Sequence, residues 1–469
     1  MLTLLDQKPD RTCEGASRRE FLRVGTLGFG GLSLANLLRS QAQAALPSNV
    51  VRPKSVVLLF LQGGPSHIEF FDPKMTAPAE FHSVNGEIKT GHAGITFGST
   101  FPQLAKLVEK FTIVRSYGSK NAGHSYGKVV SGGNPLEASA SSVYSRVVGT
   151  NNPLSGIPTN TLILPEAINP EIKLGRNFET GALPTLTQGG QLGKSFEAFN
   201  PIGGGELKKN MELRLSAERF GDRRELLGSL DQIRRDIDTQ GLLEFTDEYQ
   251  QQAFDVIANG AAKAFDLSQE DPKTIARYDT SHLFMNEEVQ RWGDMRRSSN
   301  LLGRQMLLAR RLCEAGCGFV TVSDCGWDMH SNGNSPKNLG GMKWLGPQTD
   351  HAVAAFIKDV EERGLSNDIL LIVTGEMGRT PRINRNGGRD HYGELTPLLL
   401  SGGGLKMGQV IGQSDRTASR PATTPFNPSH LFATIMHTLF DIGELRLVQS
   451  VPRDIQQIIN RDEPITGLL

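Results

Sequence analysis

Residues 55–67 read Ser-Val-Val-Leu-Leu-Phe-Leu-Gln-Gly-Gly-Pro-Ser-His, and this stretch decides the fold. It opens with a continuous apolar run, which is typical of a strand buried on both faces of a parallel sheet. Similar apolar runs recur at 111–115, 160–164, 318–323, 369–374 and 395–400. Helical patterns separate the runs, for example at 100–109, 299–316 and 348–364. The alternation predicts an α/β fold with a mostly parallel central sheet flanked by helices.

Two segments interrupt this alternation. Residues 165–206 are rich in Gly, Pro and Asn, which favours long loops over the sheet. Residues 207–297 are dense in charge, have helical periodicity and contain no strand-like run. We therefore expect residues 45–469 to form a single α/β domain, with 207–297 as a helical insertion or cap.

The first 44 residues have the layout of an export signal. Arg18 and Arg19 are followed by Phe-Leu, then by an apolar, Gly-rich run from 24 to 38 and by Ala-Gln-Ala ending at Ala44. This predicts a twin-arginine signal peptide and a periplasmic or extracellular protein. The apolar run is shorter than the ~20 residues of a spanning helix, and we expect no stable membrane span after signal removal.

Composition narrows the function classes. The chain has 469 residues, with 50 Lys and Arg against 50 Asp and Glu, so its formal net charge is zero. This argues against nucleic acid as a partner. After removal of the signal three cysteines remain, which we expect to be buried thiols: Cys313, Cys317 and Cys325.

Polar side chains follow the predicted strand at 318–323. Asp328 and His330 lie two residues apart in a loop that reads Gly-Trp-Asp-Met-His. A carboxylate and an imidazole at this spacing can bind the same divalent ion. A solvated Asp-x-His turn without a metal is the alternative.

A second polar group follows the predicted strand at 369–374. Glu376 would lie just past this strand, where an unpaired buried carboxylate is costly. A metal ion could compensate its charge, or Arg379 could do so in an ion pair without chemistry.

The stretch Gly-Gly-Arg-Asp-His at 387–391 is a third candidate. Its glycines allow the backbone to approach a ligand closely. Asp390 could orient the ring of a metal-bound His391, and Arg389 could hold an oxyanion.

Two upstream loops carry groups for proton transfer or nucleophilic attack. The first predicted strand opens into a loop with His67, and the second leads to His124 and Ser125 just before a helix. A Ser or His at a helix start lies among N–H groups that favour an anion.

Together, four stretches resemble the DUF1501 family, whose members are exported bacterial proteins of unassigned function. They are Gly-Gly-Pro-Ser-His…Phe-Asp-Pro-Lys at 63–74 and the stretches at 326–332, 374–384 and 388–392. The resemblance covers nearly all of the chain after the signal. The family is similar to the alkaline phosphatase–sulfatase superfamily, which implies an alkaline phosphatase-like fold with metals at the carboxyl ends of the strands.

The resemblance implies ligands for one divalent ion, because Asp328, His330 and His391 match the residues of one superfamily site. Glu376 matches the Asp of a second site. Met377 stands where that site's His would be. The second site therefore looks degraded.

The first-strand acid of that second site is also missing. Gln62 and Gly63 stand in its place, although His67 or Asp72 could substitute. The sulfatase signature, Cys or Ser followed by x-Pro-x-Arg, is absent from the sequence, which disfavours a formylglycine sulfatase.

These features predict a metal-dependent hydrolase of phosphate or sulfate esters, acting on a small-molecule or glycan ester with zinc, manganese, calcium or magnesium. The alternative is a catalytically inactive protein that binds anionic glycans or an envelope partner. The candidate metal ligands are Asp328, His330, His391 and Glu376. The candidate catalytic residues are Glu376, Ser125, His124, His67, Arg389 and Arg379.

Overall fold

The computed structural model describes residue 47 and residues 49–172, 181–201, 263–283, 300–331, 333 and 337–469. Its central sheet consists of β1 (Ser55–Leu61), β4 (Thr112–Val114), β5 (Asn160–Ile163), β6 (Phe319–Asp324), β7 (Ile369–Thr374), β10 (Leu399–Gly402) and β11 (Gln409–Ile411). The strand order is β11-β4-β10-β7-β1-β6-β5. Two short pairs lie outside it: β2 (Glu87–Lys89) with β3 (Thr96–Gly98), and β8 (Gly378–Arg379) with β9 (His391–Tyr392).

β1 lies in the interior of the sheet and runs parallel to both of its neighbours, β6 and β7. Its residues alternate between two hydrophobic clusters. Val57 and Leu59 belong to one cluster, and Val56 and Phe60 belong to the other. The strand is therefore buried on both faces, as its continuous apolar sequence predicts.

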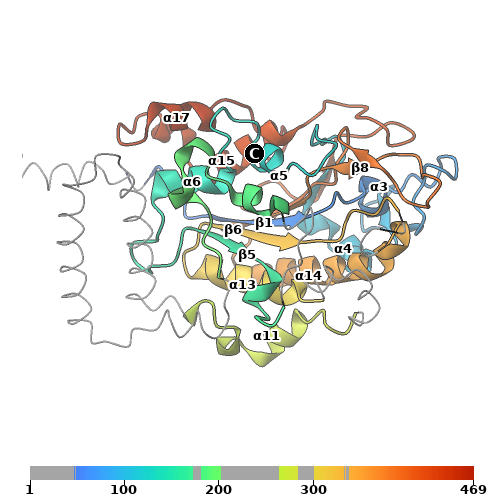
Figure 1. Cartoon of the computed structure of the whole chain (residues 1–469), viewed down its shortest axis with the longest axis horizontal. Coiled ribbons are helices and arrows are strands. Elements are labelled where there is room, and N and C mark those ends of the chain that lie inside the picture. The colour runs from blue at the N-terminus through green and yellow to red at the C-terminus, as the bar shows by residue number, and fades with distance from the viewer. Residues whose placement is uncertain are drawn as a thin grey trace, which may run out of the picture.

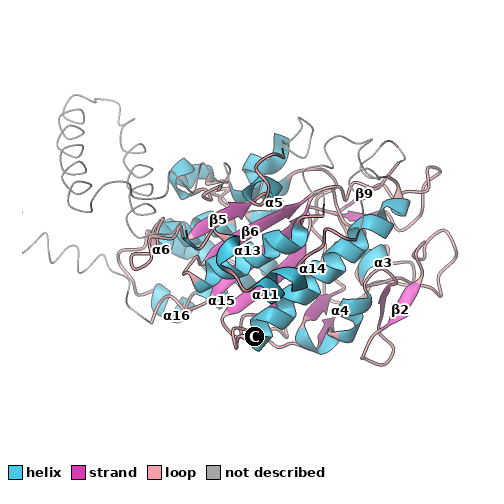
Figure 2. Cartoon of the chain, turned by 90° about the horizontal axis from the view of Figure 1, so that it is seen from below, coloured by secondary structure: helices cyan, strands magenta, loops and turns pink. Residues whose placement is uncertain are grey.

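Helices cover both faces of the sheet (Figure 1). On one face lie α4 (Pro102–Lys106), α13 (Leu302–Glu314), α14 (Met342–Glu362) and α11 (Pro272–Arg277). On the other lie α5 (Tyr126–Val130), α6 (Ala140–Val148), α15 (Pro428–Leu439) and α17 (Arg453–Ile459). Figure 2 shows α13 and α14 lying across the strands. The expected α/β fold with a mostly parallel, helix-flanked sheet is confirmed.

Short helices complete the described part of the chain. They include α3 (His67–Phe70) after β1 and α16 (Ile442–Leu445). The 3-10 helices are η1 (Val108–Lys110), η2 (Pro165–Ala167), η3 (Leu183–Thr187), η4 (Gly190–Leu192), η5 (Lys194–Phe196), η7 (Leu267–Gln269) and η9 (Leu339–Gly341). Within 165–206, the described residues form such turns and loops, as expected.

The strand predicted at 395–400 differs from the structure. It begins later, as β10 at Leu399, and it runs antiparallel to both β4 and β7. Pro397 has no N–H to donate to a sheet ladder, so pairing starts only after it. An apolar run does not encode strand direction.

The helix predicted at 348–364 also differs, because α14 already begins at Met342. Pro347 lies inside this helix, whereas a proline in a sequence usually marks a helix start. The α15 helix was not predicted, although Asn427 and His430 form a capping box at its start, with Pro428 in the first turn.

Two predicted segments fall mainly outside the described residues. The predicted signal peptide, 1–44, lies entirely outside them. Of 207–297, the structure describes 263–283, which contains η7 and α11. Among the described residues, no helix has the length and apolar character needed to cross a membrane. The three predicted thiols, Cys313, Cys317 and Cys325, are buried and form no disulfide bond among the described residues.

Candidate metal centre

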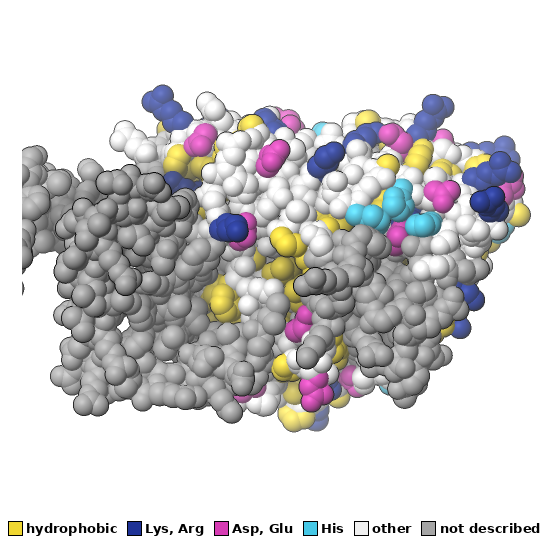
Figure 3. Space-filling view, viewed as in Figure 1, with side chains coloured by type: hydrophobic (Ala, Val, Ile, Leu, Met, Phe, Trp, Pro, Cys, Tyr) yellow, Lys and Arg dark blue, Asp and Glu magenta, His cyan; other side chains and the backbone are white. Residues whose placement is uncertain are grey.

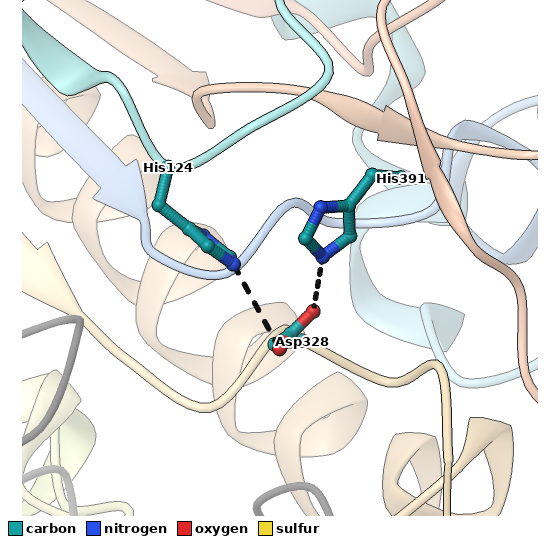
Figure 4. Close-up of side chains that lie close together, drawn as sticks. All are labelled: His124, Asp328 and His391. Carbon is teal, nitrogen blue, oxygen red and sulfur yellow. Dashed lines mark hydrogen bonds and ion pairs between the residues drawn. The ribbon is translucent and has the colours of Figure 1, made fainter.

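Three side chains from distant parts of the sequence converge beside the ends of the central strands (Figure 4). Asp328 follows β6, His124 lies just before α5, and His391 begins β9. Asp328 Oδ1 lies 3.1 Å from His391 Nε2, and Asp328 Oδ2 lies 3.8 Å from His124 Nε2. One ligand atom from each residue lies within 4.8 Å of the others, so the three can bind a common ion.

The parallel pairing of β1 with β6 places Asp328 in this position. Gln62 N–H donates to Asp324 O at the end of β6, and Trp327 N–H donates back to Gln62 O. Gly63 follows with a φ of +107°, and a Cβ added there would collide with the Asp328 backbone. The loop after β1 therefore requires glycine for its close approach to the loop after β6.

Asp328 lies between His124 and His391, supplies the carboxylate of the cluster and is only 4% exposed. Burial alone would raise its pKa. The hydrogen bond with His391 and the charge of Arg379, whose Nη2 lies 2.6 Å away, outweigh burial and hold the pKa below its usual range. Asp328 is therefore a carboxylate at neutral pH, as a metal ligand must be.

Glu376 lies directly behind His124 and is fully buried after β7. Its Oε1 lies 2.9 Å from His124 Nδ1 and accepts from Gly63 N–H at 2.9 Å. The pair with His124 favours the tautomer with the proton on Nδ1, which places an unprotonated Nε2 on the side of Asp328. Glu376 thus orients a ligand as well as being a candidate ligand.

His330 lies at the outer side of the cluster. Its Nε2 is 3.3 Å from Asp328 Oδ2, and its ring packs edge-on against the ring of His391 at 5.4 Å. Burial lowers its pKa, against the attraction of Asp328. The group whose ligand atoms lie within 4.8 Å contains His124, which the sequence analysis assigned to catalysis. It does not contain His330, which the sequence analysis assigned to metal binding.

Both predicted arginines are buried beside the centre. Arg379 donates to Asp328 and to the carbonyl oxygens of Gly63, Gly64 and Trp327. Its direct ion pair is with Asp328, whereas its charge attracts Glu376 over a longer distance, in place of the ion pair considered from sequence. The guanidinium is about 1% exposed, so it serves as a support for the loops.

Arg389 has an entirely internal role. Its guanidinium pairs with Glu69 Oε1 at 3.2 Å, and both side chains are fully buried. It also donates to the carbonyl oxygens of Thr380, Pro381, Phe81 and His82. These acceptors occupy its N–H groups, so the expected oxyanion contact of Arg389 is not supported.

Asp390 does not hold the His391 ring as expected, since its Oδ1 accepts from Asn384 Nδ2 at 2.7 Å.

His67 and Asp72 do not replace the missing first-strand acid. His67 is buried, its Nε2 lies 2.9 Å from Ala418 O, and burial lowers its pKa to about 4. Asp72 pairs with Lys74 at 3.3 Å and accepts from Ser414. A neutral buried imidazole bonded to a carbonyl is poorly suited to proton transfer with a substrate, as was expected of His67.

Gln62 and Met377 occupy the positions where the family resemblance implies ligands of a second ion. Gln62 donates to Ser323 and accepts from Tyr126 Oη at 3.4 Å. Met377 is fully buried, with its side chain against Gly64. An amide and a thioether therefore stand at the two positions where the family resemblance implies an acid and an imidazole.

The remaining donor set fits a divalent ion. Imidazole nitrogen and carboxylate oxygen are ligands for zinc and other divalent metals. In addition, Glu376 Oε2 is buried without a hydrogen-bond partner among the described residues. An unpartnered carboxylate oxygen at this depth is costly, and a cation beside it would remove that cost.

The fold and the cluster define an α/β protein with a His/Asp centre at the strand ends. Residues 53–466 match the family described as "Protein of unknown function (DUF1501)", and the chain belongs to this family. No curated protein matches the sequence.

Solved structures with some similarity include a sulfatase, a lipoteichoic acid synthase and an alkaline phosphatase. The PsFucS1 sulfatase from Pseudoalteromonas sp. has 12% identity and a TM-score of 0.35, with 92% of this chain and 74% of that chain covered. The lipoteichoic acid synthase LtaP from Listeria monocytogenes has 9% identity and a TM-score of 0.31, with coverage of 85% and 76%. The alkaline phosphatase from the Antarctic bacterium TAB5 has 10% identity and a TM-score of 0.26, with 82% of this chain and 98% of that chain covered.

Proposed function

We propose that this protein is an exported, metal-dependent hydrolase of phosphate or sulfate esters. The observation that carries the proposal is the convergence of His124, Asp328 and His391 within 4.8 Å, next to the unpartnered Oε2 of Glu376. His124, Asp328 and His391 would hold a divalent ion, with His330 or Glu376 completing the set. Zinc, manganese, calcium and magnesium are the candidates.

The reaction is the addition of water across the ester bond. The bond between the alcohol oxygen and phosphorus or sulfur breaks, the alcohol leaves with one proton, and inorganic phosphate or sulfate forms. A bound divalent ion supplies Lewis-acid polarisation of the ester oxygen. Arg379 compensates the charge of Asp328, and Glu376 orients the ring of His124.

Ser125 is the remaining candidate nucleophile. It is exposed, it precedes α5 as the N-cap residue, and it follows His124 directly in the chain. In the alternative chemistry, water attacks the ester directly. A Ser125→Ala variant separates the two, because it abolishes turnover only if Ser125 attacks.

A catalytically inactive binding protein is the second candidate function. The replacement of the second-site acid and His by Gln62 and Met377 favours it, because two-metal sites clamp both the attacking and the leaving oxygen. Such a protein would bind an anionic glycan or an envelope partner through the same centre. Fold alone does not decide between the two functions.

Export follows from the predicted twin-arginine signal, residues 1–44, and places the protein in the periplasm or outside the cell. Fusing this segment to a reporter that is active only after twin-arginine export tests this part. An Arg18→Lys/Arg19→Lys control should keep the reporter inside.

Ester turnover tests the activity. The purified protein, loaded in turn with each of the four ions, is assayed against 4-nitrophenyl phosphate, 4-nitrophenyl sulfate and a set of sugar phosphates and sulfates. We expect turnover with at least one ion, and its loss in His391→Ala. A metal-loaded protein that turns over none of these esters favours the binding protein.

A further inference from the structure

A polar groove opens from the metal centre and runs along α5. It has a volume of about 560 Å³ and is lined by residues 124–137 on one side and 181–188 on the other. His124 belongs both to the groove and to the ion-binding group, so the groove begins at the centre. Figure 3 shows histidine side chains gathered on this face, beside a surface formed by backbone and by side chains other than the charged, histidine and hydrophobic ones.

The lining is built from hydroxyl, amide and glycine groups. Its polar members are Ser125, Ser131, Asn134, Thr185 and Gln188, and its glycines are Gly127, Gly133 and Gly181. Apart from His124, the described lining contains no aromatic residue and no apolar side chain larger than that of Ala182. Hydrogen-bonding groups and small apolar groups therefore alternate along the groove, a mixture that suits a ligand with both hydroxyl groups and C–H surfaces.

The charges of the groove balance each other. Lys128 is its one lysine or arginine and Glu137 its one carboxylate among the described lining residues. A site for a polyanion would carry a cluster of basic side chains instead. The balanced charges of the described lining favour an uncharged, hydrogen-bonding molecule over a polyanion.

Hydrogen bonds hold the lining of the groove in place without a ligand. Asn134 holds its loop with bonds to the carbonyl oxygens of Ser131 and Ala138, and its Oδ1 accepts from Leu136 N–H. Across the groove, Gln188 Nε2 donates to Glu137 O and ties the two walls together. A preformed wall loses little entropy when a ligand binds.

We propose that this groove binds a polyhydroxylated chain, of the kind found in a neutral oligosaccharide or a polyol. This inference rests on the proposed function: the polyhydroxylated ligand is the alcohol part of the ester. It lies along α5, and the phosphate or sulfate group of the ester lies at the metal centre. The size agrees, because ligand sites of roughly 300–1,000 Å³ hold molecules of a few rings.

A substitution at Gly181 tests the groove most directly. A Cβ added there meets no atom of the described residues within 4 Å, and its φ is not in the left-handed region, so Gly181→Trp introduces a large side chain at a lining position. Leu154→Trp is the matched control, because Leu154 is 92% exposed and does not line the groove. Lys128→Ala is a second groove variant at an exposed position.

The first measurement is binding to an array of neutral glycans and polyols. We expect the wild type and Leu154→Trp to bind a common set, and Gly181→Trp to lose about tenfold or more in affinity for it. No binding by the wild type, or equal binding by Gly181→Trp, overturns the proposal. This readout needs no ester turnover, so its failure is distinct from failure of the proposed function.

The second measurement is the specificity ratio, kcat/KM for a trisaccharide ester divided by kcat/KM for the 4-nitrophenyl ester. Gly181→Trp should lower this ratio about tenfold, and Lys128→Ala should lower it less. The Leu154→Trp control should keep the wild-type ratio. An unchanged ratio in Gly181→Trp contradicts the assignment of the groove to the alcohol part.

Discussion

Two neighbouring halves of the same sheet edge have opposite capacities for binding. The donor half contains Asp328, His124 and His391, whose ligand atoms gather within 4.8 Å. In the blocked half, Gln62 is bonded to Ser323 and Tyr126, and Met377 is packed against Gly64. The strands and turns are continuous through both halves, so the two halves differ in their side chains and not in their scaffold. We therefore expect the side chains at a few positions to set the number of bound ions.

The largest effect is expected from Asp328→Ala in the donor half. It removes a ligand and leaves the buried guanidinium of Arg379 without its carboxylate. Breaking a buried pair in this way costs about 3–5 kcal/mol. We expect loss of bound metal together with a matching fall in the free energy of unfolding, measured by urea titration.

A matched change in the blocked half, Gln62→Ala, should leave the metal content unchanged. If it removed the metal as Asp328→Ala does, the two halves would not differ as described.

The next effect concerns the support of the donor half. Glu69→Gln would leave Arg389 buried with a weaker partner, two residues before His391. We expect destabilisation of about 3 kcal/mol and weaker metal binding, since the pair fixes the segment that carries His391. Metal affinity, measured by chelator competition, separates this positioning effect from stability alone.

A Glu69→Met/Arg389→Met variant is the control, because it removes both charges. It should recover stability more than metal affinity. Recovery of both to the same extent would mean that the pair does not position His391.

The next prediction concerns how the free energy of unfolding depends on pH through His67, which follows β1 close to Gln62. Burial lowers the pKa of His67 from 6.5 to about 4. As the pH falls from about 6.5 to about 4, the unfolded chain gains a proton at His67 that the folded chain does not. The free energy of unfolding therefore decreases over this window, by roughly 3 kcal/mol.

His67→Gln cannot titrate, so urea titrations at pH 7, 6, 5 and 4 should show a smaller loss in this variant. Identical losses in wild type and variant would place the folded pKa of His67 near its ordinary value.

The smallest effect is expected at Glu376, which lies behind His124. Glu376→Gln keeps the shape but removes the charge that favours the tautomer with the proton on Nδ1. Loss of such a partner lowers metal affinity about 10–100-fold. A complete loss of binding, equal to that of Asp328→Ala, would instead make Glu376 a direct ligand.

The fold was predictable where the pattern is local. The apolar run of β1 identifies a strand buried on both faces, and the same holds for β6 and β7. The direction of β10 was not predictable, because Leu399 and Leu400 would suit a parallel or an antiparallel partner equally well. Direction depends on the connection before the strand and not on its residues.

For the centre, local spacing identified Asp328 and His330 as candidate ligands, and the stretch Gly-Gly-Arg-Asp-His at 387–391 identified His391. The position of His124 beside them was not visible, because about 200 residues separate it from Asp328 in the sequence. The role expected for Arg389, holding an oxyanion, also could not be checked from local sequence. Its partners Glu69, Phe81 and His82 come from a distant loop, and only tertiary contacts show that its N–H groups are occupied.

Metal stoichiometry tests the difference between the two halves most directly. The protein, purified without a metal-affinity tag and incubated with zinc, manganese, calcium and magnesium, is analysed by mass spectrometry beside Asp328→Ala. We predict about one divalent ion per chain and none in the variant. Two ions per chain would contradict the blocked half, and no ion under any of these conditions would contradict the donor half.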